Sequence, residues 1–266
     1  MSSEKPLLNC VGVTRRFGSL VAVNDMSLAV RRGEILGIGG PNGAGKTTFF
    51  DVITGMTPAS AGRIEFDGRD VTQMSADRIC QMGMARTFQL NAAFEHMTVR
   101  ENVEIAAYYG RGRRLFPGLR LGRAARQAAA EALDLVGLAA KADRTVSELP
   151  VLDRKLLMIA GAIATAPKVL FLDEPVGGLN TAETDQIIAL MQRLASGGLT
   201  IVLIEHVMRF LLALSNRVMI MHHGSLLFEG RPDQVAEDDR VVEVYLGQGT
   251  KTRLRAHFAA TMEGAA

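Results

Sequence analysis

The sequence predicts an α/β fold in which a parallel-sheet core carries a helical insert and has antiparallel strands on its N-terminal side. A glycine-rich run, residues 40–47 (GPNGAGKT), stands between a short apolar strand and the start of a helix. Two continuous apolar runs, residues 169–172 and 200–204, are typical of parallel strands that are buried on both faces. A middle segment rich in alanine and arginine, about residues 99–146, has a helical pattern.

The N-terminal third is expected to consist mostly of strands. Strands are expected over residues 7–13, 21–30, 34–38 and 62–68. A turn at Phe17-Gly18 separates the first two. The strand at 62–68 alternates apolar and polar residues between two glycines, which predicts that one of its faces is exposed. A helix is expected over residues 47–53.

The middle and the last third are expected to contain helices and two further strands. Helices are expected over residues 124–136, from Arg154 and from Thr181. Gly137 ends the first of them. Asn180 and Glu183 predict a capping box for the third. A β-hairpin is expected near residues 218–228, with its turn at His223-Gly224.

Composition limits the classes of protein to consider. Apolar residues make up 48% of the 266 residues, enough for a sizeable core, and the net charge of +2 argues against nucleic-acid binding over a whole surface. Cys10 and Cys80 show no metal-ligand spacing, which predicts reduced thiols in a cytosolic setting. The N-terminus lacks an apolar signal-peptide core, and the longest apolar stretch, residues 156–166, is too short to span a bilayer. We therefore expect any membrane link to come through a partner.

Residues 40–47 carry the clearest chemical pattern. They fit G-x-x-x-x-G-K-[ST], the phosphate-binding P-loop, and they have the strand and the helix that this loop requires. Glycines let the backbone curl so that N–H groups point at phosphate oxygens, and the helix N-terminus adds a partial positive charge. Lys46 then reaches the β- and γ-phosphates, and the Thr47 hydroxyl binds Mg²⁺. The alternative is a glycine-rich turn with a surface lysine.

Two acids follow the apolar strand at 169–172. Asp173 and Glu174 would lie at the carboxyl end of a buried parallel strand, where open α/β sheets bind ligands. In a nucleotide hydrolase the first acid holds Mg²⁺, directly or through water, and the second orients and deprotonates the attacking water. An exposed turn before Pro175 is the alternative.

One histidine occupies a comparable place. His206 follows the strand at 200–204, where its imidazole can bond a γ-phosphate oxygen. His222 and His223 are expected in a solvated hairpin turn. Gln89 is uninformative by itself, and its interpretation depends on family resemblance.

Together these motifs resemble the ATP-binding subunit of an ABC transporter, over nearly the whole chain. The matches are Phe17 to the aromatic residue that stacks on adenine, residues 40–47 to the Walker A loop, Gln89 to the Q-loop, residues 169–173 to the Walker B strand, Glu174 to the catalytic glutamate, residues 178–180 to the D-loop and His206 to the switch histidine. The fold implied is a P-loop NTPase core of the ABC-ATPase type, over residues 8–248, with an antiparallel β subdomain, a helical subdomain insert at about 90–150 and a basic tail at 249–266.

The resemblance also implies a set of site residues. Nucleotide contacts are implied for Phe17, Gly40, Pro41, Asn42, Gly43, Ala44, Gly45, Lys46, Thr47, Thr48 and Gln89. Mg²⁺ is implied to bind at Thr47, Gln89 and Asp173. Glu174 and His206 are implied to be catalytic, and the cofactors implied are ATP and Mg²⁺.

Within the superfamily, four sequence segments are similar to those of the branched-chain amino-acid uptake branch. The segments that carry this similarity are residues 17–23 (FGSLVAV), 85–89 (ARTFQ), 203–206 (LIEH) and 244–247 (VYLG). The branch implies an ATPase that energises import of branched-chain amino acids or related small polar solutes. It implies permease subunits, a periplasmic or extracellular solute-binding protein and a place at the cytoplasmic face of the plasma (inner) membrane; no nucleic-acid partner is expected.

One motif departs from the family pattern. The signature usually written LSGGQ falls at residues 149–153, which read LPVLD. Pro150 lacks an N–H, Leu152 replaces a glycine, and Asp153 is expected to carry a negative charge toward the ATP of a dimer partner. Because ATP in this family lies between one subunit's P-loop and the other's signature, a heterodimer with a second, non-identical ATPase subunit is favoured.

Other interpretations stay open at this point. The chain could be a non-transport ABC ATPase, although it lacks the second cassette or long coiled-coil insertion usual there, or a nucleotide-binding regulatory subunit with low turnover. An arginine cluster in the insert has no acid among its members and is expected to form a solvated face. Its members are Arg111, Arg113, Arg114, Arg120, Arg123 and Arg126.

Overall fold

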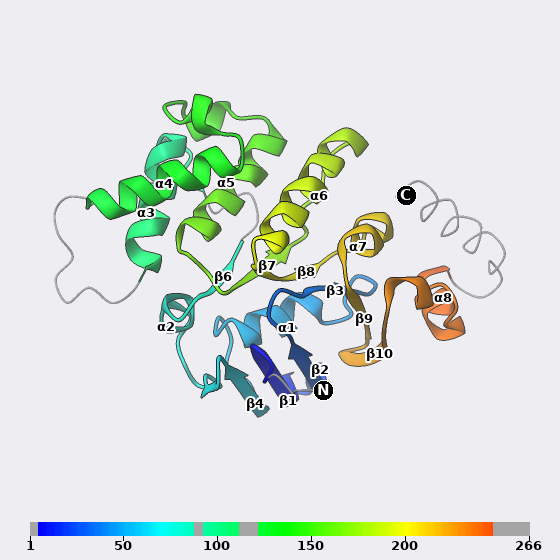
Figure 1. The fold of residues 1–266 in the computed structure, drawn as a ribbon. Helices are drawn as coiled ribbons and strands as arrows, with labels where there is room; N and C mark the ends of the chain where they lie inside the picture. The colour runs from blue at the N-terminus through cyan, green and yellow to red at the C-terminus, as the bar shows by residue number, and fades with distance from the viewer. Residues whose placement is uncertain (1–4, 88–92, 112–121, 247–266) are drawn as a thin grey trace. The chain divides into compact units, whose positions relative to one another are not determined.

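The computed structural model describes residues 5–87, 93–111 and 122–246, which form two compact units (Figure 1). The first unit contains the described residues up to 74 and from 191 onward, and the second contains those between 75 and 190. Gln89, the tail at 249–266 and the arginines at 113, 114 and 120 lie outside the described residues.

The first unit contains an antiparallel sheet with the strand order β2-β1-β4-β5. Its strands are β1 (Leu8–Phe17), β2 (Leu20–Val30), β4 (Ala61–Phe66) and β5 (Arg69–Asp70). The pairing of β1 with β2 shifts register between Cys10 and Val13, where Gly12 has φ +61°, and β1 then continues to Phe17. The irregularity explains why β1 runs past the expected end of the strand at residue 13, because a bulge redirects a strand without ending it.

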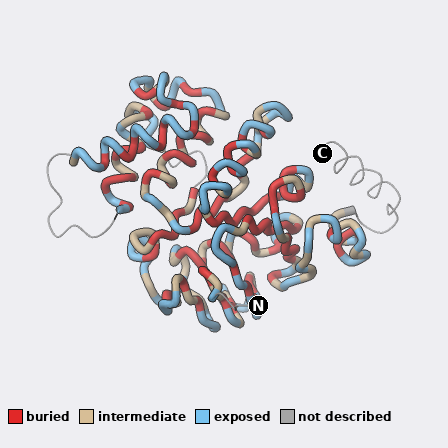
Figure 2. Tube along the Cα trace, viewed as in Figure 1, coloured by how far each residue is buried: buried red, intermediate tan, exposed pale blue. Residues whose placement is uncertain are grey.

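The same unit contains the mainly parallel strands that support the glycine-rich run. They are β3 (Ile35–Gly39), β8 (Thr200–Ile204), β9 (Arg217–His222) and β10 (Ser225–Gly230). β3 pairs in parallel with both β8 and β9, and β9 turns into the antiparallel β10. Every residue of β3 and β8 is buried, as their apolar runs predict (Figure 2).

The predicted hairpin is confirmed, and its turn has the required chemistry. His223 and Gly224 both have positive φ, 47° and 78°, which is the backbone that a two-residue turn needs to match strand twist. The remaining helices and turns of this unit are α1 (Lys46–Ile53), α7 (Met208–Leu214), η4 (Pro232–Gln234) and α8 (Asp239–Leu246).

The second unit has two parallel strands and a cluster of helices. The strands are β6 (Met84–Arg86) and β7 (Val169–Asp173). The helices and turns are α2 (Ala76–Gln81), α3 (Val99–Gly110), α4 (Arg123–Leu135), η2 (Ala139–Lys141), η3 (Val146–Glu148) and α5 (Val151–Ala164), followed by α6 (Thr181–Ser196), whose last residues belong to the first unit.

Helices α3, α4 and α5 pack against one another. α4 is the amphipathic helix predicted at 124–136, and its buried face consists mainly of alanines, which let neighbouring helices approach closely. The predicted capping box at α6 is present: Asn180 N donates to Glu183 at 2.9 Å, and Glu183 N donates to the Asn180 side chain at 3.0 Å. The helix expected from Arg154 begins earlier, at Val151, with Pro150 as its N-cap.

Two further observations concern the chain as a whole. Cys10 and Cys80 are free thiols, and burial raises the pKa of Cys10 far above its usual range. Within the described ranges, no helix combines the length and the apolar character needed to cross a membrane.

Candidate functional site

The glycine-rich run in the first unit forms a tight loop between β3 and α1. Gly40 has φ +146°, and a Cβ there would lie 2.3 Å from the carbonyl oxygen of Met221. Gly45 has φ +94°, and a Cβ there would lie 2.2 Å from the carbonyl oxygen of Ala22. Both positions therefore require glycine, because any side chain would collide with backbone in a conformation that L-residues avoid.

The loop ends at the N-terminus of α1, where the buried Lys46 begins the helix. Gly45 is the N-cap of α1, and as a glycine it has no side chain to cap the helix start. The side chain of Lys46 is buried, and its Nζ donates to the carbonyl oxygens of Gly40 at 2.7 Å and Pro41 at 3.0 Å. Thr47 is exposed beside it. An ammonium, a helix N-terminus and a hydroxyl thus gather within one turn, a combination that suits phosphate.

The two other predicted contacts of the first unit are also partly accessible. The Phe17 residue is 47% exposed, so part of its ring can meet a flat base, and the guanidinium carbon of Arg15 lies over the ring at 4.3 Å from its centroid. The His206 side chain is 48% exposed and follows β8. Its ring can therefore reach a ligand in solvent.

Sequence reasoning missed two residues that organise these elements. The Glu205 side chain is 0% exposed and accepts hydrogen bonds from the N–H groups of His206 at 3.1 Å and Val207 at 3.2 Å, which fixes the turn that presents the histidine. From α8, the Tyr245 hydroxyl lies so near Gly39 that a Cβ there would be 2.9 Å from it. Burial raises the pKa of Tyr245 to about 12. A lone acid directly after an all-apolar strand was the available signal for Glu205.

The predicted acids of the second unit lie at the end of β7. Asp173 is its last residue, and its Oδ2 lies 2.8 Å from Nη2 of Arg86, with each side chain 8% exposed. Glu174 follows with φ +48°, and its carbonyl oxygen accepts a hydrogen bond from Lys155 at 2.9 Å. A positive φ is costly for a glutamate, and such backbone strain persists only where the surrounding structure holds it. The acids are therefore held in a fixed geometry.

The expectation for Asp153 is wrong. Its side chain is 7% exposed, and its Oδ2 lies 2.5 Å from Nζ of Lys141. The carboxylate is therefore turned into the second unit and paired there, so it does not present a negative charge to a partner's nucleotide. Pro150 and Val151 are exposed at the start of α5, and this part of the departure from the family signature remains at the surface.

The arginine cluster of the insert is only partly described. Arg123 and Arg126 are exposed on α4, as expected for a solvated face. Arg111 is different, because its Nε donates to the carbonyl oxygen of Ala164 at 2.7 Å, at the end of α5. Arg111 therefore supplies a hydrogen-bond donor to the last carbonyl group of α5.

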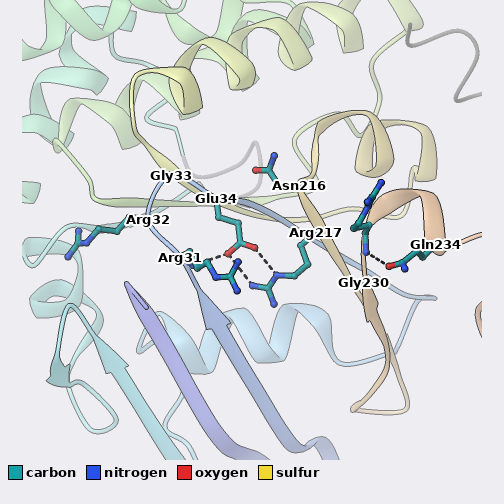
Figure 3. A pocket seen from close by; sticks show the side chains of 9 residues that line it. Arg31, Arg32, Gly33, Glu34, Asn216, Arg217, Gly230 and Gln234 are labelled. Atoms are coloured by element: carbon teal, nitrogen blue, oxygen red, sulfur yellow. Dashed lines mark hydrogen bonds and ion pairs between the residues drawn. The ribbon is translucent and has the colours of Figure 1, made fainter. Parts of the chain in front are cut away.

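A separate hollow of about 480 Å³ lies in the first unit at the end of β3 opposite the glycine-rich loop (Figure 3). Arginines line it, but most of them are paired. Arg217 contacts Glu34 at 2.7 Å and also Glu229, and Arg231 contacts Asp233 at 2.8 Å. Because these charges are matched within the protein, we do not assign the phosphate site to this hollow.

The donor set also bears on a metal. Among the described residues, no three His, Cys, Asp or Glu side chains gather as a metal cage. Mg²⁺ keeps several waters and binds through one or two carboxylates together with substrate phosphates. The Thr47 hydroxyl of the first unit and the Asp173 carboxylate of the second unit are each an oxygen donor of this kind, so each residue by itself fits Mg²⁺ that arrives with a nucleotide.

Comparison with known proteins gives consistent results. The family model described as "ABC transporter" matches residues 23–177, and one described as "Branched-chain amino acid ATP-binding cassette transporter" matches residues 225–250. The high-affinity branched-chain amino acid transport ATP-binding protein LivG of Salmonella typhimurium is 38% identical over 253 residues, which cover 92% of this chain and 99% of LivG. The corresponding protein BraF of Pseudomonas aeruginosa is 36% identical with the same coverage.

Solved structures agree with this result. A nucleotide-free ATP-binding cassette from an ABC transporter superposes with a TM-score of 0.84 at 29% identity, covering 91% of this chain and all of that chain. Another ABC transporter cassette, in its ADP conformation, gives a TM-score of 0.83 at 30% identity, covering 92% of this chain and 100% of that chain.

Proposed function

The chain belongs to the ABC transporter family of ATP-binding subunits, in its branched-chain amino acid branch, and we propose that it energises the import of branched-chain amino acids or related small polar solutes. Its family and its ABC-ATPase fold are those that the sequence predicts, and ATP hydrolysis coupled to transport is its activity. The observation that carries the site assignment is the loop at residues 40–47, with its glycine-capped helix start and buried lysine.

We assign the nucleotide contacts as follows. The β- and γ-phosphates are bound by backbone N–H groups of the loop, to which Pro41 contributes none, and by Lys46, which exchanges its bonds to carbonyl oxygens for charge-assisted bonds to phosphate. The half-exposed ring of Phe17 stacks on adenine. Gln89, outside the described residues, is assigned to the metal and its water by resemblance alone.

The catalytic groups are assigned to the ends of two strands. Glu174 orients and deprotonates the attacking water, and His206 donates a hydrogen bond to a γ-phosphate oxygen. Thr47 and Asp173 would hold Mg²⁺, and the bound ion would neutralise charge on the phosphate oxygens.

The first experiment removes the phosphate-binding ammonium. Lys46→Ala should abolish Mg²⁺-dependent binding of a fluorescent ATP analogue, because its charge-assisted contact is lost. Lys5→Ala, at an exposed lysine of the same unit, is the control and should bind like the wild type. Unchanged affinity in Lys46→Ala would show that the phosphate site lies elsewhere.

The partners form a second part of the proposal. We propose that the chain binds membrane permease subunits at the cytoplasmic face of the inner membrane, works with a solute-binding protein and pairs with a non-identical ATPase subunit. The last point is supported by the signature segment, where Pro150 offers no N–H and Leu152 stands in place of a glycine. The same segment favours a second candidate function, a nucleotide-binding subunit with low turnover.

Turnover measurements separate these alternatives. The purified chain alone should hydrolyse ATP slowly, and adding the second ATPase subunit should accelerate hydrolysis, because one composite site then has an intact signature. Rapid, cooperative hydrolysis by the isolated chain would exclude the heterodimer. Slow hydrolysis that stays slow in the assembled transporter, together with tight ATP binding, would favour the low-turnover subunit.

A further inference from the structure

Arg86 and Thr87 belong to the ARTFQ segment, but the assignments above give them no role. Arg86 is the last residue of β6, which lies in parallel register beside β7, with Arg86 opposite Phe171. β7 continues two residues beyond this pair, to Asp173, and the arginine side chain reaches along it to the Asp173 carboxylate. Nη2 of Arg86 lies 2.8 Å from Oδ2 of Asp173.

The same segment holds the backbone of Asp173. Thr87 N donates to the carbonyl oxygen of Phe171 at 2.9 Å, which continues the strand pairing beyond β6. Asp173 N donates to the Thr87 hydroxyl at 3.4 Å. Arg86 and Thr87 therefore fix both the carboxylate and the backbone of the acid.

Because this pair is buried, the electrostatic interaction between its two charges is strong. Each side chain is only 8% exposed, so water solvates the carboxylate and the guanidinium poorly. A charge buried in this way is kept only when a partner neutralises it. A guanidinium and a divalent cation are both positive, so they compete for the electron pairs of one carboxylate and repel each other at short range.

From this geometry we propose that Arg86 is a positioning residue that neutralises Asp173 before metal binding and yields part of that carboxylate to Mg²⁺, so that it sets how strongly nucleotide binding depends on Mg²⁺. The inference rests on the proposed assignment of Asp173 as a metal ligand. The pair keeps the acid oriented without metal, and the arginine's charge opposes premature binding of free Mg²⁺.

The test measures metal dependence and needs no turnover. Affinity for a fluorescent ATP analogue is measured on the full chain in EDTA and at saturating Mg²⁺. The ratio compared between variants is the affinity in Mg²⁺ divided by the affinity in EDTA. In Arg86→Gln the ratio should rise by about tenfold, because one positive charge beside the metal is lost and the uncompensated carboxylate disfavours metal-free ATP. Arg86→Lys keeps the charge and should keep a ratio near that of the wild type.

Two controls make the result specific. In an Asp173→Asn background, Arg86→Gln should leave the ratio unchanged, because the carboxylate for which the two cations compete is absent. In the wild-type chain, the side-chain ¹⁵Nε resonance of Arg86, assigned with Arg86→Lys, should shift on adding Mg²⁺ to the ATP-bound protein. This second measurement does not depend on the folding of Arg86→Gln.

The outcomes are distinguishable. If Mg²⁺ does not strengthen nucleotide binding by the wild-type chain, the proposed metal site is wrong and this inference fails with it. If Mg²⁺ does strengthen binding, but Arg86→Gln leaves the ratio unchanged or lowers it, or the Arg86 resonance does not respond, only the role of Arg86 is refuted.

Discussion

The ion pair between Lys141 and Asp153 can be tested by removing its cation. Lys141→Met keeps most of the aliphatic chain and deletes the ammonium that lies 2.5 Å from the Asp153 carboxylate. The carboxylate is then left 7% exposed without its charged partner. The free energy of unfolding should fall, because a buried charge that loses its partner is destabilising.

The exposure and the position of the pair limit the expected loss in the free energy of unfolding. Breaking a fully buried pair costs about 3–5 kcal/mol, but Lys141 is 40% exposed, so water already solvates one side of this pair. Asp153 also lies in the first turn of α5, where the helix N-terminus stabilises a carboxylate by about 0.3–1 kcal/mol. With these two corrections, we expect Lys141→Met to lower the free energy of unfolding by about 1–2 kcal/mol.

Urea unfolding of a double-mutant cycle measures the pair itself. Lys141→Met should cost about 1–2 kcal/mol in the wild type but less than about 0.5 kcal/mol in an Asp153→Asn background. The exposed pair of Arg100 with Asp143, whose side chains are 43% and 85% exposed, provides the control. Arg100→Met should change stability by less than about 0.5 kcal/mol. An equal cost of Lys141→Met in both backgrounds would refute the reasoning.

Two further predictions concern Glu174 and Tyr245, a residue of α8. Glu174→Gln should retain ATP binding while hydrolysis in the assembled transporter falls by about two to four decades, since the general base is lost; undiminished turnover would place the base on another residue. Tyr245→Phe should lose less stability at alkaline pH than the wild type does. Urea unfolding of both proteins, below pH 10 and above pH 12, measures the difference. Burial raises the pKa of Tyr245 to about 12, so its contribution is complete below the ordinary value near 10 and disappears as pH rises through 12, a change of about 3 kcal/mol. Parallel alkaline slopes for the two proteins would contradict this.

Sequence predicted best those elements whose cause is local. The loop at residues 40–47 needs glycine at particular backbone angles, the cap of α6 uses Asn180 and Glu183 three residues apart, and the β9–β10 turn needs positive φ at adjacent residues. Each requirement is complete within a few residues. The buried strands at 169–172 and 200–204 were equally clear, because burial on both faces selects continuous apolar runs.

The missed elements have weaker local patterns. β6 has only three residues, too few to show a period, and it becomes a strand by pairing with β7. α7 is almost entirely apolar around one arginine, so it lacks the polar face that marks a surface helix. Arg86 and Asp173 are 87 residues apart, and their pairing follows from strand neighbours that no local pattern reveals.

The signature segment shows how tertiary contacts change the meaning of a substitution. From the sequence, Asp153 implied a like-charge repulsion that would weaken a partner's ATP site. In the structure Lys141 pairs with this carboxylate, so the argument for an impaired signature no longer rests on charge. It rests on Pro150, which has no N–H, and on Leu152, whose bulk replaces a glycine where backbone would approach phosphate. Both changes act at short range, through sterics and hydrogen bonding, so the slow turnover proposed for the isolated chain should be largely insensitive to salt. A repulsion between exposed charges would instead weaken as ionic strength rises. Measuring turnover of the isolated chain across ionic strength therefore separates the two causes, and a rise in rate with salt would restore the electrostatic explanation.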